Sequence, residues 1–199
     1  MPKGFSQQEK LQIMQKINAV GKELFSSYGL KKTTIEDITR ASGISKGAFY
    51  LFYASKEELF MEILEAADQE IKAAMRQALL PEEKPSQASY QAAILQMLQA
   101  MQEHPLLKIF KSDEYEYLMR RLDPKIAAEH VATDAAYFRL LYTEGFERSY
   151  FRAVDPDTFT YFATALYILS LHRDQSAVFQ FEKMVTILTD MFTQHIIAP

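Results

Sequence analysis

Apolar residues recur at every third or fourth position along most of the chain, and this spacing is the strongest constraint on its fold. In the first segment they are Ile13, Ile17, Val20, Leu24 and Tyr28. Such spacing puts apolar side chains on one face of an α-helix, whereas a half-buried strand needs strict alternation. Six glycines and seven prolines in 199 residues are also few for the many tight turns of an all-β fold. The sequence therefore predicts an all-α protein.

Capping signals mark where these helices begin. The runs Ser6–Glu9 and Thr33–Glu36 have the spacing of capping boxes. Asp123-Pro124 and Asp155-Pro156 each place an aspartate cap before a proline in the first helical position. Together with the apolar spacing they predict about nine helices, over approximately residues 7–28, 33–42, 45–50, 56–80, 86–103, 112–121, 124–150, 156–171 and 178–197.

The net charge of −4 is distributed unevenly. Residues 1–56 contain nine Lys and Arg against four acidic residues, a net charge of +5, and the rest of the chain has a net charge of −9. A basic head on an acidic body is typical of a DNA-binding domain fused to a second domain.

Residues 34–52, TIEDITRASGISKGAFYLF, have the pattern of a helix-turn-helix. A helix is followed by a turn at Ser42-Gly43-Ile44 and then by a second helix, and Gly43 can adopt the positive φ that such a turn often needs. The turn would hold the second helix at a fixed angle, so that its N-terminal residues could enter the major groove of DNA.

The longer run GLKKTTIEDITRASGISKGAFYLFYASKEELF closely resembles the N-terminal domain of TetR-family transcriptional regulators. It contains T-T-x-x-x-I, a G-[IV]-S turn, K-G-x-[FL]-Y and S-K-E-x-L in that order, and the match covers about residues 10–65. Thr39 departs from the pattern, which often has Ala there. The resemblance implies a three-helix DNA-binding head over residues 1–54, with the helix-turn-helix at about 33–52. It also implies a helical body over residues 55–199 for effector binding and dimerisation.

The resemblance also assigns DNA contacts to single positions. It implies phosphate contacts at Thr33 and Thr34, where the second helix starts, and at Tyr50 and Lys56. Helix N-termini do attract anions, and a lysine such as Lys46 can donate to guanine. Taken alone, Lys46 could equally be a solvated lysine. The positions implied to lie at or near base edges are Ser45, Lys46, Gly47, Ala48 and Phe49, although Phe49 alone would be read as a core residue.

Aromatic residues are concentrated between positions 110 and 167, which fits either a plain core or a pocket for an apolar or aromatic ligand. Methionines on a facing helix would add adaptable packing. Regulators that this chain resembles have an effector pocket in the body. The candidate lining residues are Met97, Met101, Phe110, Tyr117, Tyr137, Phe138, Tyr142 and Phe146.

The resemblance implies a homodimer, because two linked heads can read a palindromic operator. In such regulators the last two helices usually form the interface. The same residues could instead pack on their own monomer. The candidates are Phe162, Leu166, Leu169, Met184, Val185, Leu188, Met191 and Phe192.

Several classes of function lack support. The chain has no cysteine, and its four histidines have no metal-ligand spacing, so we predict no metal and no cofactor. We find no pairing of a nucleophile with a base and no phosphate loop, so an enzyme is not expected. The most apolar uncharged stretch, Thr158 to Leu171, is 14 residues, too short to span a membrane. Without a visible targeting segment, a cytoplasmic protein is expected.

The sequence therefore predicts a homodimeric repressor that a small hydrophobic or aromatic effector releases from a palindromic operator in double-stranded DNA. One alternative is a small-molecule sensing module whose head contacts protein rather than DNA. A small helical enzyme is a further alternative.

Overall fold

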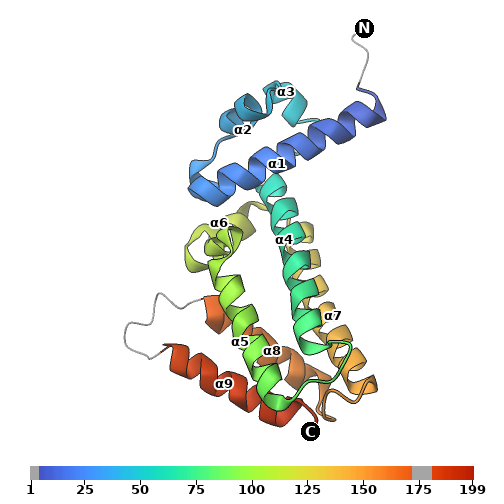
Figure 1. Cartoon of the computed structure of the whole chain (residues 1–199). Coiled ribbons are helices and arrows are strands. Elements are labelled where there is room, and N and C mark those ends of the chain that lie inside the picture. Colours follow the sequence, from blue (N-terminus) through green and yellow to red (C-terminus); the bar gives the residue numbers. More distant parts are fainter. Residues whose placement is uncertain (1–4, 172–180) are drawn as a thin grey trace.

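Helices make up the regular secondary structure of residues 5–171 and 181–199, the part of the chain that the computed structural model describes (Figure 1). The all-α prediction is confirmed, and the α-helices lie close to their predicted positions. Among the described elements, only the 3-10 helix η1, which begins at Pro105, is absent from the prediction. The predicted loop at 172–176 and the predicted start of the last helix at Val178 lie outside the described residues. The elements are α1 (Gln7–Lys32), α2 (Ile35–Ser42), α3 (Lys46–Phe49), α4 (Lys56–Leu79), α5 (Gln87–Glu103), η1 (Pro105–Lys111), α6 (Glu114–Arg121), α7 (Pro124–Glu147), α8 (Pro156–Leu171) and α9 (Phe181–Ile196).

The start of α2 shows how tertiary burial selects one of two adjacent caps. The predicted box at the start of α1 is present, but the second box is formed by Thr34 and Asp37 and not by Thr33 and Glu36. Thr33 is the C-cap of α1 and is buried, and its hydroxyl donates to the Gly29 carbonyl at 2.8 Å. It therefore closes one helix and cannot open the next.

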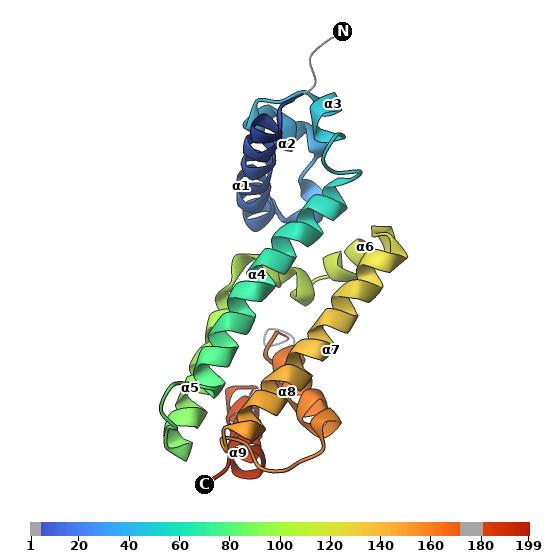
Figure 2. The same ribbon diagram turned by 90° about the vertical axis from the view of Figure 1, so that its right-hand side faces the viewer.

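The helices α1, α2 and α3 form a head at one end of the molecule, and α4 leads from it into the body (Figure 1). Figure 2 shows α4 and α7 running along the body, with α6 near the head and α8 and α9 at the opposite end. The predicted boundary after residue 54 stays a prediction, since α1 also contacts η1 and α6 of the body.

One apolar core runs through both parts. In the head, Ile17, Ile38 and Phe49 are fully buried. Gly21 lets α1 approach α4 closely, because a Cβ there would lie 2.9 Å from the Cδ1 of Ile63. The head is thus packed directly on the first turns of α4, which makes α4 a mechanical link between head and body.

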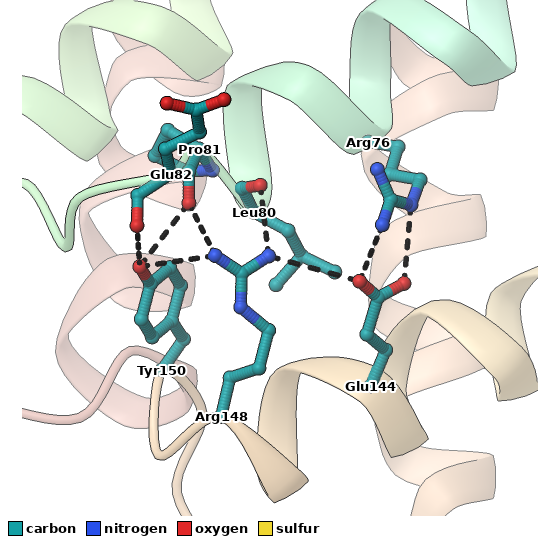
Figure 3. Close-up of polar contacts among 7 residues, drawn as sticks. All are labelled: Arg76, Leu80, Pro81, Glu82, Glu144, Arg148 and Tyr150. Carbon is teal, nitrogen blue, oxygen red and sulfur yellow. Dashed lines mark hydrogen bonds and ion pairs between the residues drawn. The ribbon is translucent and has the colours of Figure 1, made fainter.

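The far end of α4 is anchored to the end of α7 (Figure 3). The Arg148 guanidinium donates to the Pro81 carbonyl at 2.5 Å, and the Tyr150 hydroxyl donates to the same carbonyl at 3.1 Å. One turn earlier on α4, Arg76 forms a two-pronged ion pair with Glu144. Such bidentate pairs fix orientation as well as distance. The end of α4 away from the head is therefore held in place.

Candidate nucleic-acid interface and ligand cavity

The turn of the helix-turn-helix has the predicted geometry. Gly43 ends α2 in the left-handed region, at φ 64° and ψ 33°, and its N–H is bonded to carbonyls in the last turn of α2. Two residues later Ser45 caps α3, since its Oγ accepts from the Ala48 N–H at 3.1 Å. The N-terminus of the short helix α3 is therefore stabilised by the cap that directly precedes it. The helix lies at the surface of the head.

The outer face of α3 is open. Ser45, Lys46 and Gly47 are exposed, and Tyr50 is 50% exposed although it is a large aromatic residue. A Cβ added at Gly47 would meet only the Ser45 Oγ, at 3.9 Å. Nothing inside the described molecule requires a glycine there, although glycine weakens a helix. This favours the predicted reason for it, the close approach of something from outside.

Lys46 is held by a neighbour across the turn. Its Nζ forms an ion pair with Glu36 Oε1 of α2 at 2.5 Å, and both side chains are more than half exposed. The hydrogen bond from Lys46 lowers the pKa of Glu36, and the same bond raises the pKa of Lys46. Lys46 would have to leave Glu36 in order to contact a base. Sequence reasoning missed this competing carboxylate, although it lies in the motif.

Phe49 and Thr33 pack inside the head, and their role as DNA contacts stays a prediction. The Phe49 side chain is fully buried and packs against Tyr53, with ring centroids 5.7 Å apart. Thr33 is 2% exposed. Neither side chain offers a surface to a duplex. By contrast, Thr34 is exposed, and its hydroxyl donates to Asp37 Oδ2 at 2.6 Å.

Lys56 also has internal partners. Its ammonium donates to the carbonyls of Leu30 and Thr33, both at 2.7 Å, at the end of α1. Burial lowers the pKa of Lys56. Cations are favourable at the C-terminal end of a helix, where carbonyls lack partners. The lysine thus closes α1, and a phosphate contact would require it to give up these bonds.

The body contains a cavity of about 590 Å³ between α4, η1, α6, α7 and α8, which we call the body cavity. Its walls are largely apolar and aromatic, and charged side chains lie along one side. Of the eight candidates only Phe110 and Phe138 line it. The full lining is Leu64, Asp68, Ile71, Lys72, Met75, Leu107, Phe110, Ser112, Asp113, Tyr115, Glu116, His130, Asp134, Ala135, Phe138, Thr160, Tyr161, Thr164 and Ile168.

Most of the other candidate aromatics form contacts elsewhere in the body, and their assignment to a ligand pocket stays a prediction. The Tyr142 hydroxyl donates to the Val154 carbonyl at 2.5 Å and accepts from the Val154 N–H at 2.9 Å. These bonds connect α7 to the segment that precedes α8. Met101 is buried in the core and Phe146 is 48% exposed on the surface.

Two further candidate tyrosines bond at the edges of the cavity region without lining it. The Tyr137 hydroxyl donates to the Lys72 carbonyl at 2.6 Å, and that of Tyr117 donates to Glu57 at 3.1 Å. Met97 packs half-buried against the core. The role of each residue depends on which face of its helix it occupies. Composition alone does not indicate that face.

Sequence reasoning missed the charged wall of the cavity, which we call the Lys72 cluster: Asp68, Lys72, Asp134 and His130. Lys72 is 6% exposed and pairs with Asp68 at 2.5 Å and with Asp134 at 2.6 Å. Burial lowers the pKa of Lys72, but the bonds to the two carboxylates outweigh this effect and raise it. The i,i+4 spacing of Asp68 with Lys72 and of His130 with Asp134 was a usable signal.

A connection between cavity and head lies at the start of α6. Asp113 lines the cavity and also forms an ion pair with Lys31 Nζ of the head at 2.5 Å. Next to it, Glu114 Oε1 accepts from the Lys31 backbone N–H at 2.8 Å. A residue on the cavity wall is therefore bonded directly to the end of α1.

The predicted interface residues of the last two helices differ in burial within a single chain. Leu166, Val185 and Phe192 are 5%, 6% and 2% exposed and belong to the core of this chain, and their place in an interface stays a prediction. Phe192 stacks on the half-buried Phe162 at 5.6 Å. Met191 is 44% exposed, as expected.

Of the remaining interface candidates, Met184 and Leu188 are half-buried, and the side chain of Leu169 lies outside the described part. The large apolar residues that α8 and α9 expose most are Tyr161, Ile168, Ile187 and Met191. Tyr161 and Ile168 of α8 also line the body cavity, whereas Ile187 and Met191 of α9 do not.

No group of three or more His, Asp or Glu side chains in residues 5–171 and 181–199 is placed to hold a metal ion. Within the same ranges, no helix has the length and apolar character needed to cross a membrane.

Comparisons with known proteins agree with this architecture. Residues 17–70 match the family described as bacterial regulatory proteins, tetR family. The chain is 25% identical to YhgD, an uncharacterised HTH-type transcriptional regulator of Bacillus subtilis, over 145 residues, which is 72% of this chain and 74% of YhgD.

Solved structures share the fold over nearly the whole chain. A TetR-family transcriptional regulator from Pectobacterium atrosepticum has a TM-score of 0.65 at 13% identity, covering 96% of this chain and 94% of that one. RolR, solved in complex with resorcinol, has a TM-score of 0.59 at 19% identity, covering 94% of this chain and 90% of that one.

Proposed function

Because the chain belongs to the TetR family of DNA-binding transcriptional regulators, we propose that it is a homodimeric repressor that leaves a palindromic operator when a small apolar or aromatic effector fills the body cavity. The observation that carries this proposal is the open face of α3 at one end of the molecule and a largely apolar cavity in the body behind it. As a regulator of this kind it would work in the cytoplasm, beside its DNA.

The predicted DNA contacts that remain accessible support the first part of the proposal. The positions Thr34, Ser45, Lys46, Gly47 and Tyr50 are exposed in the head. A lysine and an open glycine at the start of α3 suit base edges. The net charge of +5 over residues 1–56 supplies the electrostatic attraction that any DNA contact needs.

The contacts at α6 support the second part. A ligand in the body cavity would touch Asp113 or its neighbours, and Asp113 is bonded to Lys31 of the head. Arg148 and Tyr150 anchor the far end of α4. A ligand that displaces α4 at the cavity would therefore move mainly the end of α4 that carries the head. The ligand can shift the head only by its difference in affinity between the two states, typically about 1–3 kcal/mol.

The DNA-binding part is tested with duplexes taken from the region upstream of the protein's own gene, by fluorescence anisotropy over a series of salt concentrations. We expect one duplex to bind much more tightly than the others, with affinity falling steeply as salt rises. Lys46→Ala should relax sequence preference, whereas Lys125→Ala, an exposed lysine of the body, should change nothing. Salt-independent or absent binding to every duplex would favour a head that contacts protein.

The dimer is tested by sedimentation equilibrium. Ile187 is 51% exposed on α9, and a glutamate there should disrupt an apolar interface formed by α8 and α9. Tyr28→Glu is the matched control, because Tyr28 is 62% exposed on the head. A wild-type chain that sediments as a monomer at all concentrations would contradict the proposal.

A further inference from the structure

The Lys72 cluster leaves negative charge uncompensated on the wall of the body cavity. One ammonium, that of Lys72, faces the two carboxylates of Asp68 and Asp134. The side chains of Lys72 and Asp68 are only 7% and 19% exposed, whereas that of Asp134 is 38% exposed. One of the two carboxylates is therefore largely removed from water, and the other is partly open to it. Burial raises the pKa of Asp68, as expected of a carboxylate whose charged form lacks solvation.

His130 lies at the same place. Its side chain is 9% exposed and lines the cavity. It lies one turn before Asp134 on α7, with Nε2 and Oδ2 separated by 3.8 Å, which is beyond hydrogen-bond reach. A ligand that lies between His130 and Asp134 could bond to both side chains.

The other charges around the cavity are matched. Asp113 is paired with Lys31 of the head, and Glu116 lies 3.4 Å from Arg120. Behind the cluster, a second hollow of about 360 Å³ shares Asp68, Lys72 and His130 with the cavity and adds only acidic charges, Glu62 and Glu65. The charged residues that line both hollows therefore leave the Lys72 cluster with an excess of carboxylates.

We propose that the body cavity binds an organic cation with aromatic or aliphatic bulk, whose positive charge lies against Asp134 and Asp68. This rests on the proposed function, because it names the effector class of the same cavity. The rings of Phe110, Tyr115, Phe138 and Tyr161 line the remaining wall and suit such a guest, since aromatic faces attract cations.

An anionic ligand fits the same site poorly. Among the described lining residues, the permanently charged cation is Lys72, whose ammonium already binds two carboxylates. Taking Lys72 from Asp68 would leave a largely buried carboxylate without its partner, which is unfavourable. A cation needs no such exchange, because it adds the charge that the cluster lacks.

The test uses two ions of nearly equal shape and opposite charge, tetraphenylphosphonium and tetraphenylborate, titrated into the full chain by calorimetry at about pH 8, where histidines are generally neutral. We expect the phosphonium to bind at least about tenfold more tightly than the borate. Equal affinities, or a preference for the borate, would overturn the proposal.

A variant then locates the charge that is recognised. Asp134→Asn leaves Lys72 paired with Asp68 and makes this group of three neutral, and phosphonium affinity should fall about tenfold. Glu129→Gln removes the same charge from an exposed position on α7 outside the cavity lining and should leave affinity unchanged. If Asp134→Asn does not fold, Asp68→Asn should give the same loss. Undiminished binding by a folded Asp134 or Asp68 variant contradicts the assigned contact.

DNA binding by the same preparation separates this inference from the proposed function. Protein that binds a duplex with salt dependence but prefers the borate overturns the ligand class alone. Protein that prefers the phosphonium but binds no duplex overturns the repressor and leaves the cavity's ligand class standing. If both proposals hold, the phosphonium also weakens binding to the duplex, and Asp134→Asn reduces that effect.

Discussion

Replacing Gly29 by alanine should destabilise the protein and disturb the junction between head and body. Gly29 interrupts the last turns of α1 at φ 81° and ψ 172°. This conformation is essentially confined to glycine, and other residues pay about 1–3 kcal/mol to adopt it. A Cβ there would also lie 2.9 and 3.0 Å from the two carboxylate oxygens of Glu114. The substitution therefore strains the backbone and displaces a carboxylate.

The displaced carboxylate has a function at the junction. Glu114 Oε1 accepts from the Lys31 N–H at 2.8 Å, and hydrogen bonds to charged groups contribute about 1.5–3 kcal/mol, with the lower value fitting this half-buried site. Together with the strain we expect a loss of about 3 kcal/mol. For a chain of this length that corresponds to a Tm lower by about 6–12 °C.

The assay is thermal unfolding followed by far-UV circular dichroism. Gly47→Ala is the control, because its Cβ would meet only the Ser45 Oγ at 3.9 Å, and alanine favours a helix. Glu114→Ala should show the hydrogen-bond part of the loss without the backbone strain. A Gly29→Ala protein with the same Tm as the wild type would refute the reasoning. Neither the backbone strain nor the displacement of Glu114 could then be real.

Three further changes probe other sites. Glu36→Gln should increase affinity for DNA in anisotropy titrations, because it frees Lys46 and removes a negative charge beside α3; an unchanged affinity would contradict the competition. Burial lowers the pKa of His104 in the folded state below its unfolded value of about 6.5. The stability that the neutral imidazole contributes is therefore present above pH 6.5 and is lost as the pH falls through the folded pKa. His104→Gln should make the free energy of unfolding, measured in urea, fall less steeply with decreasing pH. Gly145→Ala would place a Cβ 2.3 Å from the Phe151 ring and should lower the urea midpoint by an equivalent of about 1–3 kcal/mol, whereas an unchanged midpoint would show that the ring can move aside.

Local signals were enough to predict the helices and the helix-turn-helix. Apolar spacing identifies a helix wherever one face is buried, and Gly43 and Ser45 fix the turn through interactions within a few residues. The resemblance then placed Lys46, Gly47 and Tyr50 on the face of α3 that the structure exposes. The same reasoning could not separate Thr33 from Thr34 as a cap, because the burial of Thr33 depends on how α1 ends.

The body cavity shows the limit of sequence reasoning. A count of aromatic residues cannot tell Phe138, which lines the cavity, from Tyr142, which joins α7 to the segment before α8. Likewise the apolar spacing of α9 includes both Phe192, which is buried, and Met191, which is exposed. Both distinctions depend on which neighbouring helix covers which face.

The sequence by itself determined the all-helical fold, the helix-turn-helix and the basic head on an acidic body, since each follows from spacing, capping or charge along the chain. Tertiary structure alone decided which side chains face the cavity, which apolar face of α8 and α9 stays open, and how the Lys72 cluster forms. The physical reason is that burial and ion pairing depend on residues from separate helices. Lys72 on α4 and Asp134 on α7 are 62 positions apart in sequence, and their ion pair exists only once those helices pack together.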